Sequence, residues 1–416
     1  MNKTDNQTKK KPKEAGSIIL LGTDTPIGLA IIRELSEHGV KVIGLGRTHQ
    51  SIGGKSKKLA HYYVRKPKGE LLTEQLTQLA KAYQSTHLMA ISEADITWLN
   101  QNRHLLSDLK LLIPEQKTMD LVLNKSMTYE VAQQVGIETP SSFQISHLDE
   151  LDALSSDLSF PLVLKWANPQ EMVDKLHRSK LPLIKAQFVD DLACLRQAMT
   201  QYESIGEYPL IQDYVHGNGL GQFFLIHNGT VIQRFQHQRL HEWPPEGGTS
   251  TLCQGLDQQQ HQQLMQKSEA LLKALNWQGV AMVEYRHDSS TGRSCLMEIN
   301  GRFWGSYPLA QKSGADFAWL WFAIEGLGLT PTTSTPKVGL KCRFIFPELR
   351  RLFRVVFTPK QIKDPYYVNT PIKDLVRFIT LYLHPKTCYY VFSIADWRPF
   401  YQDVKSALKK GLSKRR

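Results

Sequence analysis

Two carboxylates, a carboxamide and a guanidinium lie in two nearby segments of this 416-residue chain. Glu284 follows a run of apolar residues. Glu298, Asn300 and Arg302 take alternate positions a little later, so a strand would place all three on one face. Magnesium prefers oxygen ligands and usually binds one or two carboxylates together with phosphate oxygens, to which arginine also binds. The pattern indicates a metal and phosphate site, although an ordinary half-exposed strand shows the same alternation.

The elements that would carry these side chains begin with a parallel α/β pattern. Apolar runs of strand length occur at 17–22, 40–45, 88–91 and 109–113. The first two, with the glycine turn and helix between them, make a βαβ unit. Gly22 and Gly28 leave the central glycine of a G-x-G-x-x-G motif unfilled, and Arg47 stands where a dinucleotide site would carry an acidic residue. The turn is a weak signal for dinucleotide binding and is typical of a tight strand-to-helix turn.

Beyond residue 123 the sequence contains several signals that are individually weak. Lys125 opens a predicted helix that runs to Gln134, and Lys165 lies at the end of a predicted strand. Another predicted strand at 210–215 is followed by a glycine-rich loop at 216–221, and a hairpin comes next. Each signal alone also has a structural explanation, such as a surface lysine whose stem lies along apolar residues.

Together and in this order, these features resemble the ATP-grasp superfamily from Gly22 to about Gly328. The similarity is greatest to carboxylate–amine ligases and more distant to biotin carboxylase and carbamoyl-phosphate synthetase. The resemblance implies a mixed α/β and α+β fold, in which a Rossmann-like domain precedes an ATP-grasp domain of two lobes. The expected divisions are a basic disordered tail at 1–16, the Rossmann-like domain at 17–115, the ATP-grasp domain at 116–330 with a hinge near 212–215, and a basic C-terminal extension at 331–416.

The resemblance also implies a role for each matching residue. The implied ATP contacts are Lys125 and Lys165 at the phosphates, Gln212, Asp213, Tyr214 and Val215 at the hinge, and Gly247 and Gly248 in a loop that closes over the triphosphate. The implied metal ligands are Glu284, Glu298 and Asn300. The implied catalytic residues are Arg239 and Arg302, which would act on the transferred phosphoryl group. The ribose contact has no clear match, because Asn218 and Gly219 occupy the stretch where relatives carry a glutamate.

The implied activity is ATP-dependent joining of a carboxylate to an amine through an acyl phosphate, with release of ADP and phosphate. Its cofactors would be ATP and two Mg²⁺ ions, or Mn²⁺ in their place. The expected partners are a small carboxylate and a small amine, neither of which the sequence identifies, and no nucleic acid.

Two other interpretations stay open at this stage. The first is an NADP-dependent oxidoreductase that uses the N-terminal βαβ unit, with Arg47 at the 2′-phosphate. Pro26, inside the glycine turn, argues against it. The second is a nucleotide-binding regulator without turnover, against which the complete set of acidic and basic site residues argues.

The formal charge of +12 is concentrated at the ends of the chain. Residues 331–416 contain 18 Lys and Arg against 5 Asp and Glu. This distribution favours contact of the basic region with a membrane surface or an anionic partner over a nucleic-acid-binding core. Five scattered cysteines, a polar N-terminus and the lack of an apolar run of about 20 residues predict a cytoplasmic protein, with peripheral contact at the inner face of the membrane.

Overall fold

The computed structural model describes residues 15–184, 186–364 and 366–413. The basic tail expected at 1–16 lies outside these residues except for its last two. The chain forms two compact units, and each combines segments that are not consecutive in sequence. Unit 1 draws on Met1–Ile113, Arg302–Lys337 and Cys388–Arg416, and unit 2 draws on Pro114–Gly301 and Val338–Thr387. Among the described residues, no helix has the length and apolar content that crossing a membrane requires.

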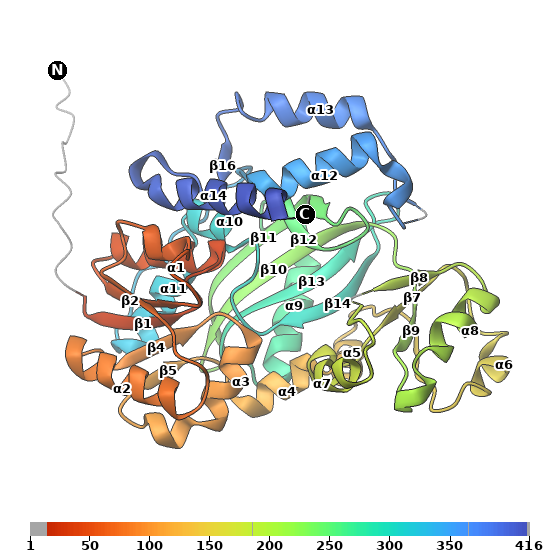
Figure 1. Cartoon of the computed structure of the whole chain (residues 1–416), viewed down its shortest axis with the longest axis horizontal. Helices are drawn as coiled ribbons and strands as arrows, with labels where there is room; N and C mark the ends of the chain where they lie inside the picture. Colours follow the sequence, from red (N-terminus) through yellow and green to blue (C-terminus); the bar gives the residue numbers. More distant parts are fainter. Residues whose placement is uncertain (1–14, 185, 365, 414–416) are drawn as a thin grey trace. The chain divides into compact units, whose positions relative to one another are not determined.

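Unit 1 is built on a five-stranded sheet with the order β3-β2-β1-β4-β5 (Figure 1). All neighbouring strands are parallel, and the central strand β1 is almost wholly buried. Parallel strands covered on both faces read as continuous apolar runs, which is why four of them were visible in the sequence. The strands are β1 (Ser17–Leu21), β2 (Lys41–Gly46), β3 (His61–Val64), β4 (His87–Ala90) and β5 (Lys110–Leu112).

The helices of unit 1 come from all three of its segments. The first begins after Thr25, whose hydroxyl accepts a hydrogen bond from the Gly28 amide at 3.3 Å. The helices are α1 (Pro26–Glu37), α2 (Glu70–Tyr83), α3 (Glu93–Gln101), α10 (Tyr307–Lys312), α11 (Phe317–Trp321) and α14 (Arg398–Ser413).

A buried carboxylate joins the segment 302–337 to unit 1. Glu34 on α1 accepts hydrogen bonds from the Tyr307 hydroxyl at 2.6 Å and from the Trp319 amide at 2.9 Å. Residues 302–337 therefore pack with unit 1. The expected ATP-grasp domain at 116–330, which includes most of this segment, stays a prediction.

Unit 2 contains a large sheet with the strand order β14-β13-β10-β11-β12-β15-β16 (Figure 1). Its long central strands are antiparallel, with β10 paired to both β11 and β13. The chain passes from unit 2 to unit 1 within the last strand. The strands are β10 (Asn218–His227), β11 (Thr230–Trp243), β12 (Thr249–Gly255), β13 (Gly279–His287), β14 (Ser294–Asn300), β15 (Lys341–Arg343) and β16 (Thr387–Tyr389).

A second, antiparallel sheet in unit 2 has the order β6-β9-β7-β8. Its own apolar core is closed by helices on one side and includes Leu162, Trp166 and Ile211. The strands are β6 (Ser142–Phe143), β7 (Leu162–Lys165), β8 (Gln187–Val189) and β9 (Leu210–Asp213). The associated helices are α6 (Glu150–Leu154), α7 (Pro169–Arg178) and α8 (Leu192–Thr200).

The remaining helices of unit 2 are α4 (Gln116–Leu123), α5 (Lys125–Gln134), α9 (Gln262–Ala274), α12 (Ile345–Phe357) and α13 (Pro371–Thr380). Within the range 331–416 that was expected as one basic extension, 338–387 belongs to unit 2, and 331–337 and the described residues from 388 onward belong to unit 1.

Candidate functional site

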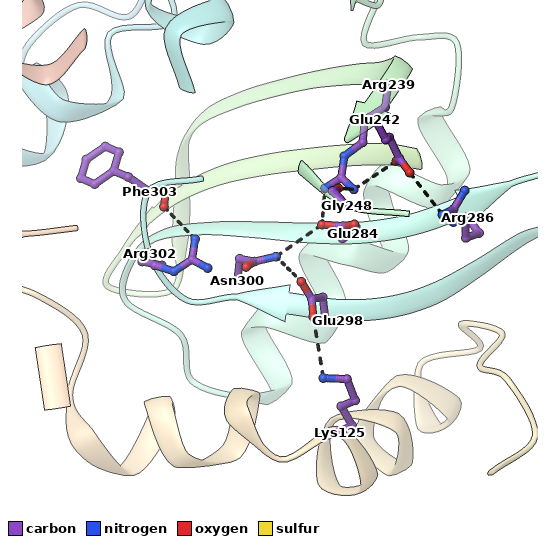
Figure 2. Close-up of polar contacts among 10 residues, drawn as sticks. All are labelled: Lys125, Arg239, Glu242, Gly248, Glu284, Arg286, Glu298, Asn300, Arg302 and Phe303. Atoms are coloured by element: carbon purple, nitrogen blue, oxygen red, sulfur yellow. Dashed lines mark hydrogen bonds and ion pairs between the residues drawn. The ribbon is translucent and has the colours of Figure 1, made fainter. Parts of the chain in front are cut away.

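Two carboxylates face each other across neighbouring strands of the large sheet. Glu284 on β13 is the register partner of Glu298 on β14, and a bulge follows Glu284. Asn300, the last residue of β14, donates its amide to Glu298 Oε1 at 3.0 Å and to Glu284 Oε2 at 3.5 Å. The strand pairing therefore brings together the three side chains that the sequence analysis singled out as metal ligands (Figure 2).

Cationic side chains surround this acidic pair. Lys125, the first residue of α5, places Nζ 3.7 Å from Glu298 Oε2, and Asn124 caps the helix by accepting from the Met127 amide at 3.2 Å. Arg239 on β11 donates Nη2 to Glu284 Oε2 at 2.5 Å (Figure 2). Each carboxylate thus has a cation beside it, and both cations sit where an incoming polyanion could exchange with the carboxylates.

The sequence analysis missed two charged residues of the same cluster. Glu242 on β11 accepts from Arg239 Nη1 at 3.3 Å and from Arg286 Nη2 at 3.3 Å. Arg286 also donates Nη1 to the carbonyl of Gly217 at 2.8 Å. The sequence could have indicated Arg286, because it lies two residues after Glu284 and therefore on the same face of β13.

The donor set fits a hard divalent cation. Burial raises the pKa of Glu284, and the charges of Glu298 and Glu242 raise it further, while Arg239 opposes the shift. Glu284 is largely buried and Glu298 is more exposed. The two neighbouring carboxylates repel each other, and a divalent cation between them would relieve this repulsion. The described residues contain no group of three or more His, Cys, Asp and Glu that could hold a metal. Two carboxylates and one carboxamide instead suit Mg²⁺, which takes few protein ligands and completes its shell with phosphate and water oxygens.

Lys165 ends β7 in the small sheet. Burial lowers the pKa of its ammonium group to about 8, and the nearby charges of Lys125 and Arg286 contribute to the shift. In the part of the chain that the structure describes, no carboxylate lies within ion-pair distance of Lys165 Nζ. A partly buried lysine among other cations is poised to receive an anion, because a bound phosphate would compensate for its lost hydration.

The segment expected as a hinge uses its side chains for structure. Gln212 on β9 is buried and donates its amide to Ser142 Oγ at 2.9 Å. Asp213 pairs with Leu162 in the sheet register. Tyr214 donates its hydroxyl to Asp364 Oδ1 at 2.7 Å. Val215 follows directly and is half-buried. The expected adenine contacts would be made by backbone groups of this segment. The side-chain contacts do not test that expectation, which stays a prediction.

The loop between β11 and β12 carries both glycines expected near the triphosphate. Gly247 has a φ of +126°, in the region that favours glycine. A Cβ at Gly248 would lie 2.2 Å from the carbonyl oxygen of Trp243, and Arg239 Nη1 donates to the Gly248 carbonyl at 3.2 Å. The loop is thus hydrogen-bonded to the same arginine that pairs with Glu284.

Arg302 does not share the strand of Glu298 and Asn300, because β14 ends at Asn300. The expectation that all three side chains project from one strand face is wrong for Arg302. Its guanidinium belongs to unit 1, where Nε donates to Glu93 Oε1 at 3.0 Å and Nη1 to the Phe303 carbonyl at 3.1 Å. This segment of unit 2 ends at Gly301. The alternating sequence pattern therefore continues one step beyond the strand that it predicted.

Comparison with known protein families matches residues 124–325 to "Carbamoyl-phosphate synthase L chain, ATP binding domain". These residues belong to the ATP-grasp superfamily. The matched segment includes the two lysines, Arg239 and the acidic pair, so the ATP-grasp assignment and the site geometry concern the same residues. It also continues into the part of unit 1 that follows Gly301. Among curated protein sequences, none matches this chain.

Solved structures share the ATP-grasp fold at low sequence identity. The biotin carboxylase domain of Hydrogenobacter thermophilus 2-oxoglutarate carboxylase, solved with MgADP, ADP and bicarbonate, is 14% identical, with a TM-score of 0.59 over 78% of this chain and 73% of that one. An L-amino acid ligase from Bacillus licheniformis is 19% identical, with a TM-score of 0.55 over 75% and 74%. N5-carboxyaminoimidazole synthetase from Staphylococcus aureus is 13% identical, with a TM-score of 0.57 over 80% and 82%. The mixed α/β ATP-grasp fold expected from the sequence is confirmed.

Proposed function

We propose that this chain is a ligase that uses ATP to join a carboxylate to an amine. The observation that carries the proposal is the cluster of Glu284, Glu298 and Asn300 within an ATP-grasp domain, flanked by Lys125 and Arg239. A donor set of this kind suits Mg²⁺ bound to a nucleotide triphosphate. Support also comes from the fold neighbours, which include an L-amino acid ligase and a carboxylase domain solved with MgADP.

The residues of the site would contribute mainly position and charge. Lys125 and Lys165 bind phosphate oxygens as cationic donors, and Arg239 exchanges its contact with Glu284 for the transferring phosphoryl group. When bound, Mg²⁺ draws negative charge from the β- and γ-phosphates. The γ-phosphoryl group moves from ATP to an oxygen of the acid, and ADP leaves. The amine then attacks the acyl carbon, the carbon–oxygen bond to phosphate breaks, and the nitrogen loses a proton to solvent.

Several finer assignments belong to the same proposal. Glu284, Glu298 and Asn300 would hold two metal ions, Mg²⁺ or Mn²⁺. Gln212 to Val215 contribute backbone groups to the adenine edge, and the loop with Gly247 and Gly248 closes over the phosphates. Arg302 steadies the phosphoryl group, which requires it to leave Glu93. The parallel sheet of unit 1 serves as a Rossmann-like domain, and the protein acts in the cytoplasm on small molecules.

No specific observation favours either alternative. The βαβ turn of unit 1 lacks the central glycine of a dinucleotide motif, and the amide of Arg47 donates to Asp24 Oδ2 at 2.8 Å. A regulator without turnover would have no need for the charged groups gathered around Glu284 and Glu298.

The test is a screen for ADP release with Mg-ATP over a library of acids and amines. We expect Glu298→Gln to reduce turnover by about a thousandfold or more, because it removes a metal ligand at the reacting phosphates. Glu269→Gln is a matched control, since Glu269 pairs with Arg234 and Lys273 away from the cluster. Equal ADP release by wild type and Glu298→Gln, with their substrates present, would refute the metal assignment.

A further inference from the structure

Two helices of unit 2 bury charged side chains and expose several apolar ones. On α12 and α13, Glu348, Arg351 and Asp374 are 2%, 6% and 5% exposed. Ile372 on α13 is 79% exposed, and Leu383, just beyond its end, is 85% exposed. A helix that packs on a globular core normally shows the opposite arrangement.

A network of paired charges fixes this orientation. Glu348 accepts from the Thr251 hydroxyl on β12 and lies 2.5 Å from His241 Nδ1 on β11. Asp374 accepts from Arg351 Nη2 at 3.3 Å, which joins α13 to α12. Buried charges are costly unless they are paired, so rotating either helix to bury its apolar side would strand these groups. Figure 1 shows α12 between the strands β11 and β12 and the outermost helix α13.

The outward side chains form a continuous pattern at helical spacing. On α13 and just beyond it they follow i, i+3, i+4, i+7 and i+11, and on α12 they follow i, i+4 and i+8. We call them the outer face: Leu349, Phe353, Phe357, Ile372, Leu375, Val376, Ile379 and Leu383. All are between 41% and 85% exposed. Exposed apolar groups in this number mark a surface that contacts something apolar.

The charge around the outer face is almost wholly basic. The segment 345–386 contains three carboxylates, and each is engaged within unit 2. Glu348 and Asp374 belong to the buried network, and Asp364 accepts from the Tyr214 hydroxyl. The exposed charged residues are Arg350, Lys360, Lys363, Lys373, Arg377 and Lys386. An anionic partner would be attracted, and a second copy of the same face would be repelled.

A basic pocket opens beside the apolar stripe of α13. Its volume is about 470 Å³, and its lining includes Lys341, Lys373, Arg377 and His384 together with Val376 and Leu381. Cationic groups next to aliphatic ones match a phosphate that is attached to a hydrocarbon chain.

We propose that the outer face docks onto a bilayer that contains anionic phospholipid. The apolar side chains of α12 and α13 enter the boundary between headgroups and acyl chains, with the helices parallel to the surface. The basic residues contact lipid phosphates, and the pocket beside α13 receives a headgroup. The proposal stands independently of the ligase activity.

The test is sedimentation of the full chain with vesicles of phosphatidylcholine, or of equal parts phosphatidylcholine and phosphatidylglycerol. We expect binding to the anionic vesicles, weakened by salt, and little binding to the neutral ones. Ile372→Ser with Ile379→Ser should lower the vesicle partition coefficient about tenfold or more, because two aliphatic side chains no longer enter the bilayer. Lys363→Glu with Lys373→Glu should lower it to a similar degree at low salt.

A matched control replaces exposed leucines of unit 1, with Leu71→Ser and Leu105→Ser, which are 56% and 50% exposed in the wild type. This control should bind vesicles as the wild type does. Failure of the wild type to sediment with anionic vesicles overturns the proposal, as does undiminished binding of the Ile372 and Ile379 double variant. Light scattering that detects a dimer lost in that variant, without vesicle binding, would assign the face to self-association instead. ADP release is measured separately, so the vesicle-binding results can be interpreted even if the ligase proposal fails.

Discussion

At the scale of single residues, the candidate site is a patch of alternating charge. Glu242 bridges Arg239 and Arg286, and Glu284 pairs with Arg239. These pairs neutralise the cations as long as no polyanion is present. A triphosphate with Mg²⁺ would exchange partners, since the phosphates take the cations and the metal takes the carboxylates. Among the described residues no carboxylate forms an ion pair with Lys165, although the charges of Glu298 and Glu284 partly oppose the effect of its burial.

We expect ATP binding to depend on pH through Lys165. Its pKa of about 8 means that the free protein loses this positive charge as the pH rises through that value, whereas bound phosphate favours the protonated form. We expect Mg-ATP affinity to be constant below that pKa and to fall above it, with uptake of a proton on binding. Lys165→Met should weaken binding roughly ten- to a hundredfold at neutral pH and abolish this pH dependence. Titration calorimetry from neutral pH to about pH 10 in two buffers measures both effects.

The control for this experiment is Lys175→Met, because Lys175 lies exposed on α7 and pairs with Glu207. It should retain the affinity and the pH profile of the wild type. An unchanged dissociation constant in Lys165→Met would remove Lys165 from the phosphate site.

At the scale of elements, the β11–β12 hairpin connects the arginine of the site to a glycine loop. Arg239 contacts Glu284 and the carbonyl of Gly248 with the same guanidinium. The position of the loop and the ion pair of Glu284 therefore both depend on the Arg239 side chain. Movement of Arg239 toward a phosphate would free the loop to close.

Gly248→Ala tests whether this loop geometry matters. The added Cβ would lie 2.2 Å from the backbone oxygen of Trp243, which a flexible side chain cannot relieve, so the loop must shift. We expect a fall in kcat/KM of about tenfold or more, because displaced catalytic groups lose rate steeply with distance. Steady-state ADP release measures it. Gly305→Ala is the matched control, since its Cβ would meet no atom within 4 Å, and equal losses in both variants would contradict a specific role for the loop.

At the scale of the whole molecule, each unit is assembled from segments far apart in sequence. Residues 302–337 and the described residues from 388 onward belong to unit 1 with the N-terminal segment, and 338–387 belongs to unit 2. Arg33 on α1 donates to Asp396 Oδ2 at 3.0 Å, and Glu34 beside it binds Tyr307 and Trp319. The stability of unit 1 therefore depends on buried ionisable groups that join its three segments.

Glu34 should make the stability of unit 1 depend on pH. Burial raises the pKa of Glu34 from 4.5 to about 8, although hydrogen bonds from Tyr307, Trp319 and Ala318 oppose the shift. Folding thus favours the protonated acid, so the free energy of unfolding is fully retained below the unfolded pKa and decreases as the pH rises from 4.5 toward 8. In Glu34→Gln this decrease disappears, at the cost of an overall loss of about 1–3 kcal/mol from an imperfect hydrogen-bond partner. Urea unfolding of both proteins across this range provides the comparison, and parallel curves would contradict the buried titration.

The sequence by itself determined the local elements and the family. Four strands of the parallel sheet and the helix Lys125–Gln134 were predictable, because continuous apolar runs and helix caps are local signals. The edge strand β3 was missed, since His61–Val64 is half-exposed and lacks an apolar run. The order of lysines, glycine loop and acidic residues was enough to identify the ATP-grasp superfamily.

Only the tertiary structure decided which residues share a core or a site. In the sequence, Arg302 continues the same alternation as Glu298 and Asn300. In the structure, however, the strand ends at Asn300 and Arg302 belongs to the other unit. Glu242 and Arg286 entered the cluster through strand pairing, and α13 turned its apolar stripe outward because Asp374 is paired inside. Local preference sets how a segment folds, but the free energy of burial and charge pairing between distant segments sets where it lies.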